Sequence, residues 1–551
     1  MAITQKNSSL PSLAPYVDLK KKKILIVDDF TSFRSTVKRM LQVLGLMHID
    51  EASDGEEAIS KLSKRKYDIV LCDYNLGPGK DGQQVLEEAR GREYIDYSTI
   101  FIMATAENTM YMLMGALEYQ PDAYLVKPFN REILERRLKE WVNKKDNLKD
   151  IEKAIEKKDH ETVISLCDQI LGSNPKNLSQ ILQLKGEALL MKGDHSEAGI
   201  FYEKVLTMGN LPWAALNLGK VRFFTGNYEA AKEIFEGIIA QNDKIVFAYD
   251  WLAKVHQKMG NLQAAQEVLE KAVLISPKAI LRQKALGDIA YKNKDLVVAE
   301  KSFREAVEQG KHSFFKSPSD FTSLAKVLVD NDNPEESLNV LNNAGKEFTK
   351  NPDALLQIAI TEMRTLQKMN REEDAKKVME KVSKLSSELP GKPSSDTELD
   401  LARMLLLAGD EAGGNAIIRR LIQNNHEDEE FIANVGMIFK ELNIEDKGQE
   451  IIALARDEVI ILNNDGVSQV KEGNLYKAIE LFEKAVGRLP DNKIICANAA
   501  QAYMAFMKKN GSDPQLLKKT RECLDRVTQL DPSYKNLNVL MTRYKELEME
   551  A

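Results

Sequence analysis

The sequence is poor in the residues that mark several classes of protein. Its 551 residues include only 4 cysteines and 6 histidines. No two cysteines are spaced as Cys-x-x-Cys and the histidines stand singly, which argues against a disulfide framework, a thiolate zinc site and a paired-histidine metal site. With 16 prolines and 29 glycines, the chain is also unlike collagen or Pro/Gly-rich disordered segments.

A basic excess and long apolar runs are also missing. The 84 acidic residues outnumber the 77 lysines and arginines, giving a net charge of −7. This balance argues against a nucleic-acid partner, RNA bound by the helical part included. No stretch of 18 apolar residues occurs, so we expect no membrane span. Residues 1–15 lack the charged-then-apolar layout of a signal peptide, and we expect a cytoplasmic protein.

Residues 21–145 alternate between short apolar runs and amphipathic stretches. We predict helices at 30–44, 54–65, 82–92, 108–119 and 130–143. The apolar runs between them predict strands at Ile24–Val27, Met47–Glu51, Ile69–Cys72, Ile100–Ala104 and Ala123–Val126. Strands and helices that alternate at this spacing indicate a doubly wound parallel sheet. In such sheets, ligands bind beyond the carboxyl ends of the strands.

Polar side chains follow four of these strands directly. They are Asp28 and Asp29, Asp73, Thr105 and Lys127. Clustered carboxylate oxygens suit Mg²⁺, and a carboxylate beside the metal can act as a nucleophile toward phosphorus. The hydroxyl and the ammonium can hydrogen-bond phosphoryl oxygens. A single Asp after a strand is more often a helix N-cap, but five suitable residues at four strand ends are hard to explain in that way.

These stretches resemble the receiver domain of two-component response regulators. The resemblance rests on ILIVDDF (24–30), YDIVLCDYNL (67–76), IFIMATAEN (100–108) and AYLVKPF (123–129). It implies a flavodoxin-like α/β domain over residues 21–146, preceded by a tail at 1–20. It also implies that a cognate sensor histidine kinase or phosphotransfer protein is a partner.

The resemblance assigns roles to the residues at the strand ends. Asp73 would be the phosphoacceptor, and Thr105 and Lys127 would contact the phosphoryl group. Tyr124 would act with Thr105 as a switch that carries the signal to the helix at 108–119. A cis peptide is implied at Lys127-Pro128. The implied ligands of Mg²⁺ are Asp28, Asp29, Asp73 and the backbone carbonyl of Asn75.

The loop after the acceptor departs from the family pattern. It reads YNLGPGKDG, and Pro78 lies five residues after Asp73, where the family has a proline four residues on. We therefore expect a loop that is one residue longer and has a different local shape. A change in this loop can alter how long the phosphoryl group stays on the acceptor.

Residues 147–551 contain a repeat of about 34 residues instead of strands. Alanines recur at steps of 33, 34 and 34, each followed four residues on by a large apolar side chain and preceded by a small residue twelve positions earlier. Small residues that face large ones are typical of closely packed helix pairs. The three sets are Ala198, Ala231, Ala265 and Ala299; Tyr202, Phe235, Leu269 and Phe303; and Gly186, Gly219, Ala253 and Gly287.

This pattern resembles the tetratricopeptide repeat. The resemblance implies an all-α helical solenoid over 147–551, clearest at 179–310 and 459–532, in which the first helix of each pair lines a groove that binds protein segments. The middle of the array, 318–458, is less regular. The expected groove contacts are Asn217, Lys220, Arg222, Lys254 and Gln257.

The two parts together suggest a function. No kinase, cyclase or helix-turn-helix motif follows residue 146, so the array itself is the expected output. The first hypothesis is a phosphorelay response regulator that acts by protein–protein contact and is no enzyme beyond its own phosphoryl transfer and dephosphorylation. The alternative is a phosphate sink that buffers a kinase, with the array as a localisation or oligomerisation device.

Overall fold

The computed structural model describes residues 19–106, 121–173, 177–389, 393–531, 534 and 536–550. They fall into two compact units, residues 1–320 and 321–551. Among the helices described in these ranges, none has both the length and the apolar character needed to cross a bilayer.

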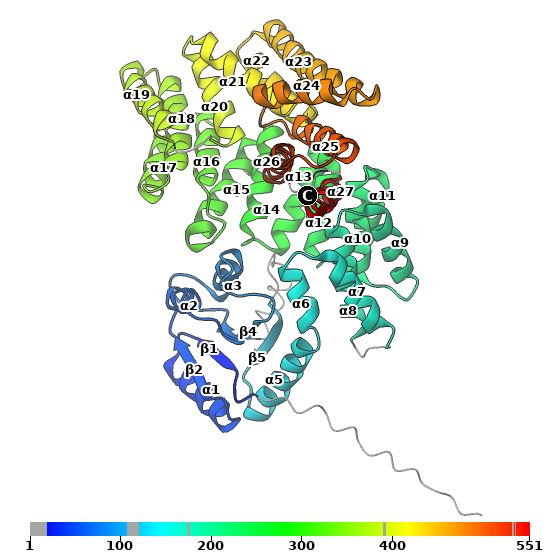
Figure 1. Ribbon diagram of the computed structural model, residues 1–551. Helices are drawn as coiled ribbons and strands as arrows, with labels where there is room; N and C mark the ends of the chain where they lie inside the picture. The colour runs from blue at the N-terminus through cyan, green and yellow to red at the C-terminus, as the bar shows by residue number, and fades with distance from the viewer. Residues whose placement is uncertain are drawn as a thin grey trace, which may run out of the picture. The chain divides into compact units, whose positions relative to one another are not determined.

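A parallel sheet forms the N-terminal part of the first unit, as predicted (Figure 1). Its strands follow the order β2-β1-β3-β4-β5, which places β1 and β3 side by side in the middle. Strands β1 and β3 are nearly continuous apolar runs, as expected for strands in a sheet that helices cover on both faces. The five strands are β1 (Lys23–Val27), β2 (His48–Ala52), β3 (Ile69–Asp73), β4 (Ile100–Ala106) and β5 (Ala123–Lys127).

Two helices cover each face of this sheet within the described residues. Helices α1 (Thr31–Val43) and α5 (Arg131–Asp146) share one buried cluster with Ile24 and Ile26 of β1. Helices α2 (Gly55–Leu62) and α3 (Gly82–Gly91) share the cluster on the other face. The sequence boundary at 146 coincides with the last residue of α5. The helix predicted at 108–119 lies outside the described residues.

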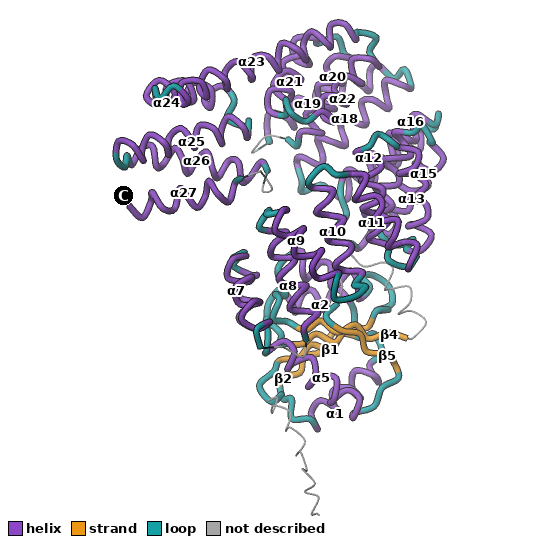
Figure 2. The backbone as a smooth tube through the Cα atoms, turned by 90° about the vertical axis from the view of Figure 1, so that its right-hand side faces the viewer, coloured by secondary structure: helices purple, strands orange, loops and turns teal. Residues whose placement is uncertain are grey.

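Helix pairs follow in the rest of the first unit, and Figure 2 shows them as successive hairpins. The expected helical solenoid is confirmed here. The helices are α6 (Lys149–Glu156), α7 (His160–Leu171), α8 (Leu178–Met191), α9 (His195–Leu206), α10 (Pro212–Phe224), α11 (Tyr228–Gln241), α12 (Val246–Lys258), α13 (Leu262–Ile275), α14 (Ile280–Lys292), α15 (Leu296–Gln309) and the 3₁₀ turn η1 (Gly310–His312).

The predicted small-to-large pairs form the core of these hairpins. A Cβ added to Gly219 would lie 2.5 Å from the Phe235 ring, and one added to Gly186 would lie 2.6 Å from the Tyr202 ring. The four repeating alanines are fully buried. In these two pairs, the backbones can approach closely because the first helix carries a glycine where the second carries an aromatic ring.

A short turn separates the two helices of a pair in a recurring way. A residue in the left-handed region, such as Gly226 with φ of 77°, ends the first helix. The next residue caps the second helix: Asn227 accepts a hydrogen bond from the Ala230 N–H, and Asp194 and Asp295 do the same in their own turns. Such caps satisfy backbone donors that the helix itself leaves without partners.

The second unit is also helical throughout its described part. Its helices are α16 (Pro318–Asp330), which begins in the first unit, α17 (Pro334–Glu347), α18 (Pro352–Lys368), α19 (Glu372–Glu388), α20 (Ser395–Leu407), α21 (Glu411–Asn424), α22 (Glu429–Glu441), α23 (Glu445–Lys471), α24 (Leu475–Arg488), α25 (Lys493–Asn510), α26 (Pro514–Leu530) and α27 (Leu537–Glu550).

One helix of this unit differs from the expected regular pairs. Helix α23 runs for 27 residues, so the repeat expected to begin at 459 starts inside a continuous helix. Its sequence has no proline, and its Gly466 is used for packing: a Cβ there would lie 2.7 Å from the Phe482 ring. Gly448 in the first part of α23 lies against Phe439 of α22, and Gly466 in the last part lies against Phe482 of α24.

Candidate functional site

The carboxyl ends of β1 and β3 bring three carboxylates together. Suitable oxygens of Asp28, Asp29 and Asp73 all lie within 4.8 Å of one another. Asp28 is buried and Asp29 is exposed, so the cluster opens to solvent on one side. The spacing follows from the parallel register, in which Val27 lies opposite Cys72. This confirms that the strand ends converge as the sequence suggested.

Lys127 joins two of these carboxylates from the end of β5. Its ammonium lies 2.8 Å from an oxygen of Asp28 and 2.8 Å from an oxygen of Asp73. The peptide bond from Lys127 to Pro128 is cis, as expected. Burial raises the pKa of the Asp73 carboxyl, while the hydrogen bond and charge of Lys127 oppose that rise.

The charge of the cluster suits a divalent cation. Three carboxylates and one ammonium lie at this strand edge, and oxygen ligands with an open side are what Mg²⁺ prefers. The side chains present therefore fit the ion, with Asp28, Asp29 and Asp73 as ligands. The part expected of the Asn75 carbonyl stays a prediction.

Thr105 and Tyr124 lie on the neighbouring strands β4 and β5, where Thr105 is paired with Val126 and Tyr124 with Met103. Thr105 is 1% exposed, and its hydroxyl donates to the Ala106 carbonyl at 3.1 Å. Tyr124 packs on the apolar cluster beneath α2 and α3, and burial raises its pKa to about 12. The switch role of this pair stays a prediction.

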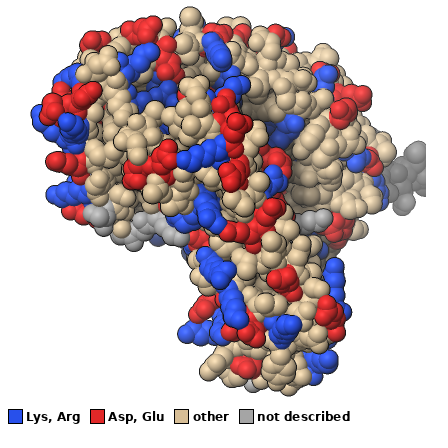
Figure 3. Space-filling model, turned by 90° about the horizontal axis from the view of Figure 1, so that it is seen from above, with Lys and Arg blue, Asp and Glu red and all other residues tan. Residues whose placement is uncertain are grey.

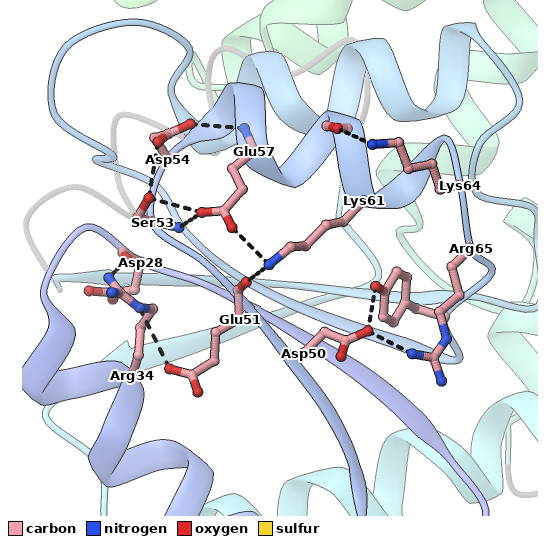
Figure 4. A network of polar contacts seen from close by, with 12 residues as sticks. Asp28, Arg34, Asp50, Glu51, Ser53, Asp54, Glu57, Lys61, Lys64 and Arg65 are labelled. Carbon is pink, nitrogen blue, oxygen red and sulfur yellow. Dashed lines mark hydrogen bonds and ion pairs between the residues drawn. The ribbon is translucent and has the colours of Figure 1, made fainter.

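Two residues that no sequence motif marked also shape the site. Arg34 in the first turn of α1 donates to the Asp28 carbonyl at 2.6 Å and lies 3.7 Å from a Glu51 oxygen, as Figure 4 shows. Phe33 places its ring centre 4.2 Å from the Lys127 ammonium. The helix predicted at 30–44 contains both residues, but its prediction does not specify which groups their side chains contact.

The long loop after Asp73 leads directly into α3. Gly77 and Gly79 adopt φ of 73° and 103°, which other residues rarely do. Asp81 then caps α3 by accepting from the Gln84 N–H at 2.9 Å, and the Gln84 side chain accepts from the Asp81 N–H at 3.1 Å. The acceptor loop and this helix are therefore tied together.

The expected groove residues gather partly around Trp251. The Lys254 and Lys220 ammonium groups lie 4.4 and 5.7 Å from its ring centre, and the Phe224 ring centre lies 5.7 Å away. We call Lys220, Phe224, Trp251 and Lys254 the Trp251 patch. Burial lowers the pKa of Lys220. The three other expected contacts lie on the same two helices, α10 and α12. Asn217 is buried, Arg222 pairs with Glu203, and Gln257 is the third. Whether any of them binds a partner stays a prediction.

Comparison with known proteins matches both parts of the chain. A family model for the response regulator receiver domain matches residues 24–139, and one for the tetratricopeptide repeat matches residues 248–278. Chemotaxis protein CheY-3 of Vibrio cholerae serotype O1 is 37% identical over 119 residues, which are 22% of this chain and 90% of that protein. Chemotaxis protein CheY of Pseudomonas aeruginosa is 34% identical over 116 residues, 21% of this chain and 92% of that protein.

The solved structures that resemble part of the chain include a repeat protein. It is a tetratricopeptide repeat protein from Parabacteroides merdae, with 14% identity and a TM-score of 0.37, and the match covers 50% of this chain and 98% of that one.

Proposed function

We propose, from the premise that the chain belongs to the response regulator receiver family and continues into tetratricopeptide repeats, that it is a phosphorelay response regulator. Its receiver would take a phosphoryl group on Asp73, and its array would bind another protein. The observation that carries the proposal is the position of Asp73, between the Lys127 ammonium and two further carboxylates.

The chemistry expected at Asp73 is a phosphoryl transfer. A carboxylate oxygen of Asp73 attacks phosphorus, and the bond from phosphorus to the donor breaks. The donor leaves as the imidazole of a histidine or, for a small acyl phosphate, as a carboxylate. The Lys127 ammonium pairs with the Asp73 carboxylate before the transfer. After the transfer, we expect it to pair with an oxygen of the phosphoryl group instead.

The rest of the site supports this step. Asp28, Asp29 and Asp73 would hold Mg²⁺, which when bound offsets the negative charge of the phosphoryl group. Thr105 offers a hydroxyl at the same strand edge. Water would then hydrolyse the acyl phosphate. The reactions that we propose for the receiver are its own phosphorylation and dephosphorylation.

For output, we propose that the Trp251 patch binds an acidic or polar protein segment. Two ammonium groups flank an aromatic ring there, a combination that suits carboxylates next to apolar side chains. Figure 3 shows positive and negative side chains interspersed over the face in view, which is unlike the basic stripe of a nucleic-acid binder.

The phosphorylation proposal is tested by labelling the full chain with radioactive acetyl phosphate and Mg²⁺. Wild type is expected to incorporate an acid-stable, base-labile label, and Asp73→Asn is expected to incorporate none. Asp54→Asn is the matched control, because Asn can also cap α2 where Asp54 accepts from the Glu57 N–H. Label that persists on Asp73→Asn would show that the acceptor lies elsewhere.

The output proposal is tested by capture of partners on the full chain. A Lys220→Glu/Lys254→Glu variant is expected to lose the partner that wild type retains. Lys271→Glu, an exposed lysine on the second helix α13, is the control. If both variants retain the partner while Asp73→Asn alone changes the phosphoryl level of the kinase's other target, the protein is a phosphate sink instead.

A further inference from the structure

The receiver touches the array at a place away from the chain connection at 146–149. The outer face of α3 meets the segment that joins α15 to α16. Ser313 donates to a Glu87 oxygen at 3.2 Å, and the Gln84 amide donates to the Gln309 carbonyl at 3.4 Å. We call this meeting of α3 with residues 309–314 the α3 contact. All of its residues belong to the first compact unit.

An aromatic ring completes the α3 contact. The Phe314 ring covers Gly91 so closely that a Cβ on Gly91 would lie 2.4 Å from it, and the Arg92 guanidinium lies 5.8 Å from the ring centre. The absence of a side chain at Gly91 is therefore what makes room for the ring. Shape fit and hydrogen bonds together make this a specific surface, although it is small.

The array presents its side of the α3 contact on a well-held segment. The Phe315 N–H donates to the Ser313 hydroxyl at 3.0 Å, and Lys284 donates to the Phe315 carbonyl at 2.8 Å. Lys284 also lies 2.7 Å from Asp320, which is 2% exposed. A preorganised segment loses little entropy when it docks.

The receiver side is continuous with the proposed phosphoacceptor. The Gly82 N–H donates to the Tyr74 carbonyl at 2.8 Å, and a Cβ on Gly82 would lie 2.1 Å from the Asp73 carbonyl oxygen. Gln84 connects the two ends, because its oxygen accepts from the Asp81 N–H while its nitrogen donates to Gln309. A movement of the loop 74–81 therefore reaches the array through one side chain.

We infer that α3 is the docking surface of the receiver for residues 309–314 of its own array, and that occupancy of Asp73 changes this docking through the loop 74–81. The second part rests on the proposed function, since it takes Asp73 as the acceptor. A small contact suits such a switch: the two sides are tethered in one chain, so even a weak contact forms, and a modest bias suffices to open it.

Hydrogen exchange on the full chain tests the inference. In wild type, peptides covering 82–92 and 309–316 are followed with and without beryllium fluoride plus Mg²⁺, which stands in for the phosphoryl group. Phe314→Ala is expected to speed exchange in both peptides by about threefold or more, because it opens the contact locally. The matched control is Lys311→Ala, an exposed side chain of the same segment.

The fluoride complex is expected to change exchange at 309–316 in wild type, and to leave it unchanged in Phe314→Ala and Asp73→Asn. Unaltered exchange in Phe314→Ala would overturn the docking surface. A contact that responds to Phe314→Ala but not to the fluoride complex would overturn the coupling. Labelling of the same wild-type preparation by acetyl phosphate separates this from the proposed function: label without a change in exchange defeats the inference alone, whereas no label defeats the acceptor assignment.

Discussion

The Lys127 ammonium lies 2.8 Å from a carboxylate oxygen of Asp73, the residue expected to accept the phosphoryl group. The pair forms between the ends of β5 and β3, which are not neighbours in the sheet. Burial raises the pKa of Asp73 and Lys127 opposes the rise. Lys127 thus helps to keep the acceptor in the ionised form that can attack phosphorus.

Replacing Lys127 with methionine is therefore expected to slow labelling from acetyl phosphate and to change its pH dependence. Loss of the ammonium would remove the ligand proposed for the phosphoryl group, and we expect a decrease of about tenfold or more, or ~1.4 kcal/mol. The labelling rate should rise with pH as Asp73 ionises, and the midpoint should move to higher pH in the variant. Initial rates across the pH range measure both effects, with Lys139→Met on the exposed face of α5 as control. An unchanged midpoint would contradict the role given to Lys127.

Asp73 should also affect stability in a direction set by its raised pKa. A group whose folded pKa exceeds its unfolded value contributes stability below the unfolded pKa, and that contribution is lost as pH rises through the folded pKa. Without Mg²⁺, Asp73→Asn is therefore expected to be more stable than wild type at neutral pH. The difference should shrink as pH falls toward the ordinary value of 3.8.

Chemical unfolding in a chelating buffer measures this difference. Asp50→Asn is a useful contrast, because Asp50 accepts hydrogen bonds from Arg65 at 2.9 Å and from Tyr67 at 2.7 Å. That variant is expected to be less stable than wild type. If Asp73→Asn also loses stability, the cluster is held together by Asp73 and not strained by it.

The sequence predicted the sheet and the acidic site because both depend on local patterns. Short apolar runs mark most of the strands, and a parallel sheet must bring Asp28 and Asp73 to one edge. The α3 contact was not predictable in this way, since Gln84 and Gln309 are 225 residues apart and no pattern relates them. The sequence also did not predict the length of α23. Gly466 fits the position of a repeat glycine, and only the structure shows that it lies inside a continuous helix and packs on the Phe482 ring.

Glu57 provides a prediction with the opposite sign to Asp73. Its pKa is lowered to about 2 by the hydrogen bond from Lys61 and by that from the Ser53 N–H. A lowered folded pKa adds stability above the ordinary value of 4.5, and this is lost as pH falls toward 2. Glu57→Gln is expected to be less stable at neutral pH by less than about 1 kcal/mol, because the pair with Lys61 is partly exposed and screened by water.

Unfolding of the Glu57→Gln variant at several pH values checks this expectation. The gap to wild type should close between pH 4.5 and pH 2. Glu140→Gln, an exposed residue on α5, should track wild type throughout. A gap that is constant over the whole acid range would mean that Glu57 acts by packing and not by charge.

Close packing in the array predicts opposite effects for two glycines of one helix pair. Gly219 on α10 has no room for a side chain, whereas a Cβ on Gly237 of α11 would meet no atom within 4 Å. Helix propensity favours alanine over glycine by about 1 kcal/mol at either position. Overpacking costs about 1–3 kcal/mol, so Gly219→Ala is expected to destabilise the pair and Gly237→Ala to stabilise it.

Hydrogen exchange of α10 and α11 is the suitable measurement, because repeat arrays need not unfold in one step. Gly219→Ala should raise exchange in both helices, and Gly237→Ala should lower it. Adding Phe235→Leu to Gly219→Ala should restore part of the protection, since the Phe235 ring is the group that the new methyl meets. If Phe235→Leu adds its own loss independently, the two side chains are not coupled, and the small-to-large pairing that repeats through the array is not what sets the distance between its helices.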